Sequence, residues 1–167
     1  MAEGNVTELN AEARDQNADR KRWMGILARA TSNELERAWS SIDDHPAYVW
    51  LREPEVGLVM VRARAGGTGD LFNMTEMTMT RCALRLADGT TGYAFVQGRD
   101  ERQAELAAVF DALMQRPEHR AAIARSVIDP LHAAQAERRR QKSLKAAATK
   151  VEFFTMVRQE SRKGAPK

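Results

Sequence analysis

The stretch RCALRLADGTTGYAFV, residues 81–96, carries the clearest structural signal in the chain. Apolar and polar residues alternate on both sides of Asp88 and Gly89, and this alternation is typical of two half-buried strands. The Asp-Gly pair suits a two-residue type I′ turn, because both central positions of that turn need a positive φ. The sequence therefore predicts an antiparallel hairpin here.

The predicted turn determines which residues lie opposite each other in the hairpin. One face would carry the apolar pairs Leu86 with Thr91, Leu84 with Tyr93, and Cys82 with Phe95. The other face would carry Arg81 with Val96, Ala83 with Ala94, and Arg85 with Gly92. Small residues on this second face would leave room for the two arginine side chains to lie along the surface.

Helical patterns flank the hairpin on both sides. The first is an apolar stripe at i, i+3, i+4 and i+7, formed by Trp23, Ile26, Leu27 and Ala30. Thr31 and Glu34 fit a capping box that starts a second helix. Asp100 is expected to cap a third helix that ends before Pro117. Asp129 precedes a proline and is expected to cap the last helix, which is rich in alanine and arginine.

The segments between the helices and the hairpin complete the fold prediction. Residues 58–61 form a short apolar run that predicts a buried strand, and residues 65–75 are expected to form a loop. The fold class is then α+β, with N-terminal helices, a three-stranded antiparallel meander, and C-terminal helices with a basic tail. We expect residues 1–18 to be a disordered leader, residues 19–136 to form the domain, and residues 137–167 to form the tail.

Charge is distributed unevenly along the 167 residues. The net charge is +3, but residues 137–167 contain ten Lys or Arg against three Asp or Glu. Such a tail forms either a solvated helix surface or a docking surface for an anionic partner. A nucleic-acid-binding protein is the alternative from another functional class, although no recognition helix is visible. An apolar patch in the tail would either fold back on the domain or dock to a partner through Phe153, Phe154 and Met156, and its position after a solvated helix favours the partner.

The composition argues against several kinds of site. The single cysteine, Cys82, cannot form an internal disulfide, and the three histidines lack the spacing of metal ligands, so we expect no metal site. Cys82 also lacks a nearby histidine and orienting group, so no nucleophile or other catalytic residue is identified. No apolar run approaches the ~18 residues of a membrane helix, and we expect a soluble, cytoplasmic protein.

A glycine-rich loop at residues 65–73 is the candidate binding site. It is not a P-loop, because no Gly-Lys-Ser/Thr follows, and this weakens the alternative of an autonomous phosphotransferase. Either its glycines only permit an unusual connection between strands, or its N–H groups bind an anionic group beside arginines. Glu76 and Arg81 either orient a substrate or pair with each other or a neighbouring subunit. The candidates for phosphate binding or a subunit interface are Arg62, Arg64, Gly66, Gly67, Gly69, Asn73, Glu76, Arg81 and Arg99.

Several strings resemble, in their order and number, the PhnG family of carbon-phosphorus lyase subunits. They are RWMGILA at 22–28, LREPEVGLVMVR at 51–62, GGTG at 66–69, FN at 72–73, EMTMTRC at 76–82, GRD at 98–100 and AAVFDAL at 107–113. The resemblance extends from residue 22 to residue 157 and covers nearly all of the expected folded part.

This resemblance implies a subunit of a bacterial core complex with PhnH, PhnI and PhnJ, in which PhnI is the direct contact. The complex would use ATP and methylphosphonate as substrates, and the phosphonate would displace adenine from ATP. The nucleosidase-like chemistry is attributed chiefly to PhnI. No cofactor is expected on this chain alone, because one cysteine cannot hold the iron-sulfur cluster that PhnJ uses. We therefore expect an accessory subunit, with the arginine- and glycine-rich region at or near an interface.

Overall fold

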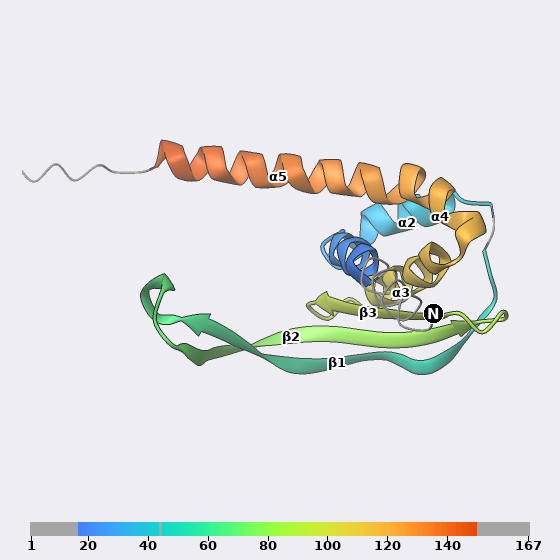
Figure 1. Cartoon of the computed structure of the whole chain (residues 1–167), viewed down its shortest axis with the longest axis horizontal. Coiled ribbons are helices and arrows are strands. Elements are labelled where there is room, and N and C mark those ends of the chain that lie inside the picture. The colour runs from blue at the N-terminus through green and yellow to red at the C-terminus, as the bar shows by residue number, and fades with distance from the viewer. Residues whose placement is uncertain (1–16, 44, 150–167) are drawn as a thin grey trace, which may run out of the picture.

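The computed structural model describes residues 17–43 and 45–149 and has the expected α+β architecture (Figure 1). One layer is an antiparallel sheet of β1 (Tyr48–Arg64), β2 (Leu71–Leu86) and β3 (Thr91–Gln97), in that order. The described helices pack on one face of this sheet and leave the other face open. The predicted three-stranded meander is confirmed.

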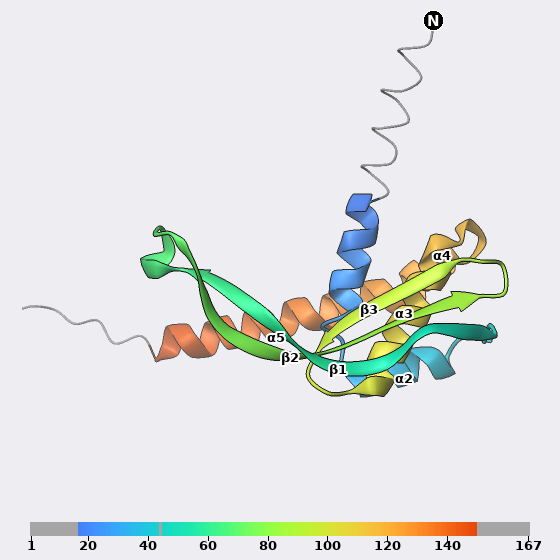
Figure 2. The same ribbon diagram turned by 90° about the horizontal axis from the view of Figure 1, so that it is seen from below.

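The first two strands are much longer than the third. β1 and β2 have 17 and 16 residues, whereas β3 has 7 and pairs with β2 only as far as Met79. Residues 58–78 therefore continue beyond the sheet as a two-stranded ribbon, which we call the arm (Figure 2). At about 3.3 Å per residue the arm is roughly 25 Å long.

Two expectations for this region were wrong. Residues 58–61 do not form a short buried strand, because they lie within the exposed arm, where Leu58 is 68% exposed. The loop expected at residues 65–75 is much shorter, since β2 already begins at Leu71. A 3₁₀ turn, Ala65–Gly67, closes the tip of the arm.

The turn between β2 and β3 also differs from the predicted type. No non-glycine residue in the described chain has a positive φ, so Asp88 does not form the type I′ turn. Instead, the N–H of Gly89 donates to the carbonyl of Leu86 at 3.0 Å, and the N–H of Leu86 donates to the carbonyl of Thr90 at 2.9 Å. With Gly89 at φ 90°, this is a three-residue loop, a type I turn followed by a bulge.

The longer loop shifts the hairpin register by one residue. The observed pairs are Arg85 with Thr91, Leu84 with Gly92, Ala83 with Tyr93, Cys82 with Ala94, and Arg81 with Phe95. Tyr93 and Phe95 are 39% and 51% exposed, whereas Gly92 and Ala94 are buried. The predicted cross-strand pairs were therefore wrong, because a slip of one residue moves every β3 side chain to the opposite face.

α3 (Glu101–Gln115) lies at the centre of the fold and packs directly on β3 (Figure 1). Its N-terminus is capped as predicted, with the N–H of Gln103 donating to the Asp100 side chain at 2.8 Å. Small residues allow a very close approach to the strand. A Cβ added to Gly92 would lie 2.0 Å from the carbonyl oxygen of Ala108. Gly92 is thus required for the close packing of α3 on β3. The expectation that it leaves room on the surface for an arginine side chain was wrong.

The two helices that precede the sheet in the chain pack near α3. The described part of the first covers residues 17–27, and α2 (Ser32–Ser40) follows it. The predicted apolar stripe is buried at all four positions, Trp23, Ile26, Leu27 and Ala30. The capping box of Thr31 and Glu34 is present as predicted.

The C-terminal helices form one almost continuous rod. α4 (Pro117–Ile123) passes through a π turn, Ala124–Ile128, into α5 (Asp129–Ala148). Asp129 has helical φ and ψ and does not cap a new helix, so that expectation was wrong. The wide π turn accommodates Pro130, which lacks the N–H of a regular helical residue.

α5 projects from the body on the same side as the arm (Figures 1 and 2). Only Leu131 is buried in it, so the expected basic, largely solvated helix is present as far as Ala148. Of the leader expected at residues 1–18, residues 17 and 18 belong to the N-terminal helix, and the rest lies outside the described residues. The apolar patch of Phe153, Phe154 and Met156 also lies outside them.

Candidate functional site

The tip of the arm brings together six of the predicted site residues, which are Arg62, Arg64, Gly66, Gly67, Gly69 and Asn73. The positive φ angles of Gly66 and Gly67, 59° and 84°, allow the chain to reverse there. The N–H groups of Thr68 and Gly69 both donate to the carbonyl of Ala65. These two donors are consumed within the turn, so the geometry favours the interpretation of a connection between strands over that of an anion site.

The arginine beside the turn is also engaged by the loop. Nη1 of Arg64 donates to the carbonyl oxygen of Gly69 at 3.0 Å. Arg62 lies opposite Asn73 in the strand pairing, on the same exposed part of the arm. The arrangement stiffens the tip of the arm.

The three other predicted site residues lie apart from the tip. Glu76 pairs with Met60 in the middle of the arm, and Arg99 follows the end of β3. Arg81 does not bond to Glu76. It donates to Glu55 at 2.5 Å, and Arg52 donates to the same carboxylate at 2.6 Å. These two arginines hold the pKa of Glu55 below its usual range. The nine candidates are therefore spread along one edge of the molecule and do not form a single pocket.

Exposed apolar side chains are what the sequence analysis missed on the arm. Those with large exposed fractions are Leu58, Met60, Leu71, Phe72 and Met74. Leu58 and Met60 share one face of the ribbon because they are two residues apart in a strand. An isolated two-stranded hairpin is at best marginally stable in water. An arm with apolar side chains on its surface thus has the character of a surface that binds another protein.

The open face of the sheet carries a second set of exposed apolar side chains. Tyr93, Phe95, Val49 and Leu51 lie exposed on it. At the base of the arm a cavity of about 350 Å³ is lined by Gly57, Leu58, Val59, Met79, Arg81 and Phe95. Leu58 and Met60 pair with Thr78 and Glu76, so they lie on the ribbon face that continues the helix-facing side of the sheet. The arm and the open face are therefore two candidate interaction surfaces that meet at this cavity.

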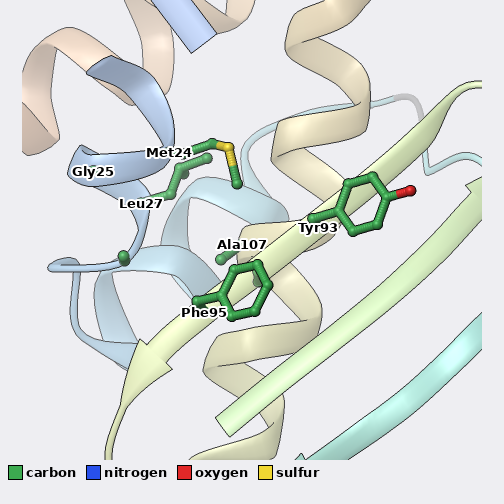
Figure 3. A pocket seen from close by; sticks show the side chains of 8 residues that line it. Met24, Gly25, Leu27, Tyr93, Phe95 and Ala107 are labelled. Carbon is green, nitrogen blue, oxygen red and sulfur yellow. The ribbon is translucent and has the colours of Figure 1, made fainter. Parts of the chain in front are cut away.

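A smaller apolar pocket lies between β3, α3 and the N-terminal helix (Figure 3). Its volume is about 170 Å³, below the ~300 Å³ at which small-molecule sites begin. Met24 and Leu27 project into it from the helix, opposite Phe95 on the strand, and Ala107 forms its floor. The hydroxyl of Tyr93 points away from it. Its lining offers packing contacts and no acid-base pair.

A buried carboxylate closes the free edge of β3 beside that pocket. Asp111 is fully buried and accepts from the guanidinium of Arg20 at 2.7 and 3.2 Å and from Nε1 of Trp23 at 2.9 Å. It also accepts from the backbone N–H of Tyr93 at 3.0 Å. The carbonyl oxygen of Thr91 accepts hydrogen bonds from the side chains of Arg20 and Gln115. Side chains therefore satisfy the outward backbone groups at this end of β3, which protects the edge from pairing with another chain.

Cys82 is a core residue. Burial, together with the nearby charge of Glu105, raises the pKa of its thiol to about 12. The thiolate is the reactive form of cysteine, so this side chain is suited to packing and not to nucleophilic chemistry. Within residues 17–43 and 45–149, no group of three or more His, Cys, Asp or Glu side chains is arranged to hold a metal ion.

We predict that Cys82 does not react with a disulfide reagent in the native protein at pH 8. The folded thiol is both protonated and inaccessible, whereas the unfolded thiol has the ordinary pKa of about 8.5. Reaction with Ellman's reagent should therefore appear only after addition of denaturant. The variant Ser143→Cys, on the exposed face of α5, is the control and should react at one thiol per chain without denaturant. Rapid reaction of the native wild-type thiol would contradict the assignment.

Known proteins place the chain in a family. The family described as "Phosphonate metabolism protein PhnG" matches residues 18–159. The chain belongs to the PhnG family. A PhnG relative from Rhizobium meliloti (strain 1021), named "Alpha-D-ribose 1-methylphosphonate 5-triphosphate synthase subunit PhnG", is 47% identical over 147 residues. The alignment covers 86% of this chain and 91% of the relative. The resemblance identified from the sequence strings is confirmed.

The PhnG match includes all three strands, so the arm lies within the family region. The name of the relative describes it as a subunit, and an exposed apolar arm is a feature expected of a chain that assembles with others. No helix in the described part of the chain has the length and hydropathy needed to span a membrane.

Proposed function

We propose that this chain is an accessory subunit of an enzyme complex that forms α-D-ribose 1-methylphosphonate 5-triphosphate from ATP and methylphosphonate. In that reaction an oxygen of methylphosphonate bonds to C1′ of the ribose, the bond from C1′ to the base breaks, and adenine leaves. The family membership and the name of the 47% identical relative support this reaction. The chain itself would bind no cofactor, and ATP and methylphosphonate would be substrates of the complex.

The exposed arm is the observation that supports an accessory role for this chain. It presents Leu58, Met60, Phe72 and Met74 to solvent, while Arg64 at its tip and Arg81 at its base bond within the chain. The described residues contain no reactive thiol and no close acid-base pair in an open pocket. We therefore propose that the arm and the open sheet face hold a catalytic partner, for which the PhnI subunit is the first candidate, within an assembly that also contains PhnH and PhnJ.

Co-expression tests the proposal directly. The full chain would be produced with the PhnH, PhnI and PhnJ subunits of the same bacterium, and the products would be separated by size-exclusion chromatography. Adenine release from ATP plus methylphosphonate would then be measured by chromatography with and without this chain. We expect co-elution, and turnover that depends on its presence. Separate elution together with unchanged adenine release would refute the proposed function.

A further inference from the structure

A cationic pocket lies between the N-terminal helix and α5. Figure 2 shows these two helices beside each other. Its volume is about 320 Å³. It is lined by Lys21, Arg22, Gly25, Ile26, Arg29, His132, Gln135, Ala136 and Arg139. Four of these side chains carry a permanent positive charge at neutral pH, and none of the lining residues is acidic.

The two helices present these residues on matched faces. His132, Gln135, Ala136 and Arg139 are spaced at i, i+3, i+4 and i+7 on α5, so they share one side of that helix. The amide of Gln135 donates to the carbonyl of Ile26 at 2.8 Å and fixes the distance between the helices. The pocket is thus part of a helix-helix contact and not a chance gap between mobile side chains.

Arg139 differs from the arginines on either side of it. Arg138 is paired with Glu34 at 2.6 Å, and Arg140 is paired with Glu137 at 2.8 Å. Within residues 17–43 and 45–149, no carboxylate forms an ion pair with Arg139, Arg22, Arg29 or Lys21. The arginines that point away from the pocket are neutralised by the protein, and those that line it are not.

Gly25 gives the pocket a second unusual feature. Gly25 lies in the last turn of the N-terminal helix, which ends at residue 27. A Cβ at Gly25 would lie 3.3 Å from Nη1 of Arg29, which donates to the carbonyl of Gly25 at 2.7 Å. The missing side chain therefore leaves the space in which the Arg29 guanidinium lies against the helix.

We propose that this pocket binds the oligophosphate group of a small molecule, such as a nucleoside or sugar triphosphate. Four cations around one pocket repel one another, and a bound anion would offset that repulsion. Guanidinium groups match the geometry of phosphate oxygens and bind them with two parallel hydrogen bonds. A group with several negative charges balances four cations better than a single carboxylate does. The volume falls at the lower end of the ~300–1,000 Å³ typical of small-molecule sites.

The named ligands belong to the same class as the substrate and product of the proposed function, so the inference deepens that function. The two can still fail separately, because this one is tested by binding to the chain alone and the other by adenine release. Inorganic tripolyphosphate is the probe, titrated into the full chain by isothermal calorimetry without divalent cations, with ATP and uncharged adenosine as further arms. We expect one site per chain for tripolyphosphate and ATP and none for adenosine. Affinity should fall as salt rises, because ions screen the charges.

Two double variants separate a built pocket from general positive charge. Arg22→Gln with Arg139→Gln removes two charges inside the pocket, and affinity should fall about tenfold or more, since hydrogen bonds to charged groups are the strong ones. Lys142→Gln with Lys145→Gln removes two charges from the exposed part of α5 and should change affinity much less. Equal losses in the two variants, or no binding by the wild-type chain, would overturn the proposal.

Discussion

Replacing Leu58 and Met60 by glutamate is expected to remove this chain from its assembly without unfolding it. Both side chains point to solvent on the same face of the arm, with exposed fractions of 68% and 47%, so the substitution breaks no buried contact. In an assembly that covers the arm, two carboxylates would be buried against an apolar partner. The few hot-spot residues of an interface cost about 2 kcal/mol or more each when truncated, and burying an unpaired charge adds to this.

The measurement is co-elution of the variant with the PhnH, PhnI and PhnJ subunits, together with circular dichroism of the variant alone. Leu144→Glu on α5 is the matched control, because Leu144 is an exposed leucine, 52%, that lies off the arm. The arm variant should lose co-elution and keep its spectrum and melting temperature, and the control should keep both. Co-elution of the arm variant at the wild-type level would show that the partner binds elsewhere.

The arm shows where prediction from the sequence stopped. The run at residues 58–61 is apolar, and apolar runs between turns usually form buried strands. Whether such a strand is buried depends on how far its neighbours extend, and β3 ends at Gln97, opposite Met79 of β2. That length difference is a property of the pairing and not of either strand by itself. The sequence consequently predicted the strand but not its exposure.

The length of β1 was not predicted because a proline lies within the strand. Pro54 lies within the strand, and a proline removes one N–H donor from a β ladder. It is accepted here because β1 is an edge strand and because the pairing with β2 is irregular between Arg52 and Glu55. From sequence alone the same residue looks like the end of an element.

The predicted register of the β2–β3 hairpin was wrong because the turn type was wrong, and this error placed every β3 side chain on the wrong face of the sheet. Asp-Gly is compatible both with a two-residue type I′ turn and with a three-residue loop in which only Gly89 has positive φ. The two-residue turn places Tyr93 and Phe95 on the same face as Leu84 and Cys82, which agrees with the rule that apolar residues share the buried face. The structure instead buries Gly92 and Ala94 against alanines of α3, because small residues let a helix lie very close to a strand. The alanine-rich sequence of α3 was the signal that could have corrected the register.

The predictions for the N-terminal helices were confirmed because they depend only on residues close together in the sequence. The stripe of Trp23, Ile26 and Leu27 and the capping box of Thr31 and Glu34 depend on residues within two turns of each other. The buried carboxylate of Asp111 could not have been predicted in this way. Its partners Arg20, Trp23 and Tyr93 come from two other elements of the chain.

Replacing Asp111 by alanine is expected to destabilise the fold by about 3 kcal/mol, because a buried donor left without its acceptor costs about 1–3 kcal/mol, while the Arg20 side chain is 28% exposed and can be hydrated. The carboxylate is fully buried and accepts hydrogen bonds from Arg20, Trp23 and the N–H of Tyr93. In the variant these donors lose their acceptor, and each buried donor left unpaired adds to the cost. The free energy of unfolding, measured by urea titration with circular dichroism, checks the prediction.

Two further variants separate this cluster from general effects of substitution. Trp23→Phe removes the donor at Nε1 and also one of the two fused rings of a buried side chain, so we expect a loss of about 1–3 kcal/mol that combines a hydrogen bond with a small cavity. Asp129→Ala removes an exposed aspartate from α5 and should change stability by no more than about 0.5 kcal/mol. A loss for Asp111→Ala as small as that of Asp129→Ala would contradict the argument. The carboxylate would then fill space at the edge of β3 without holding the N-terminal helix, α3 and the strand together.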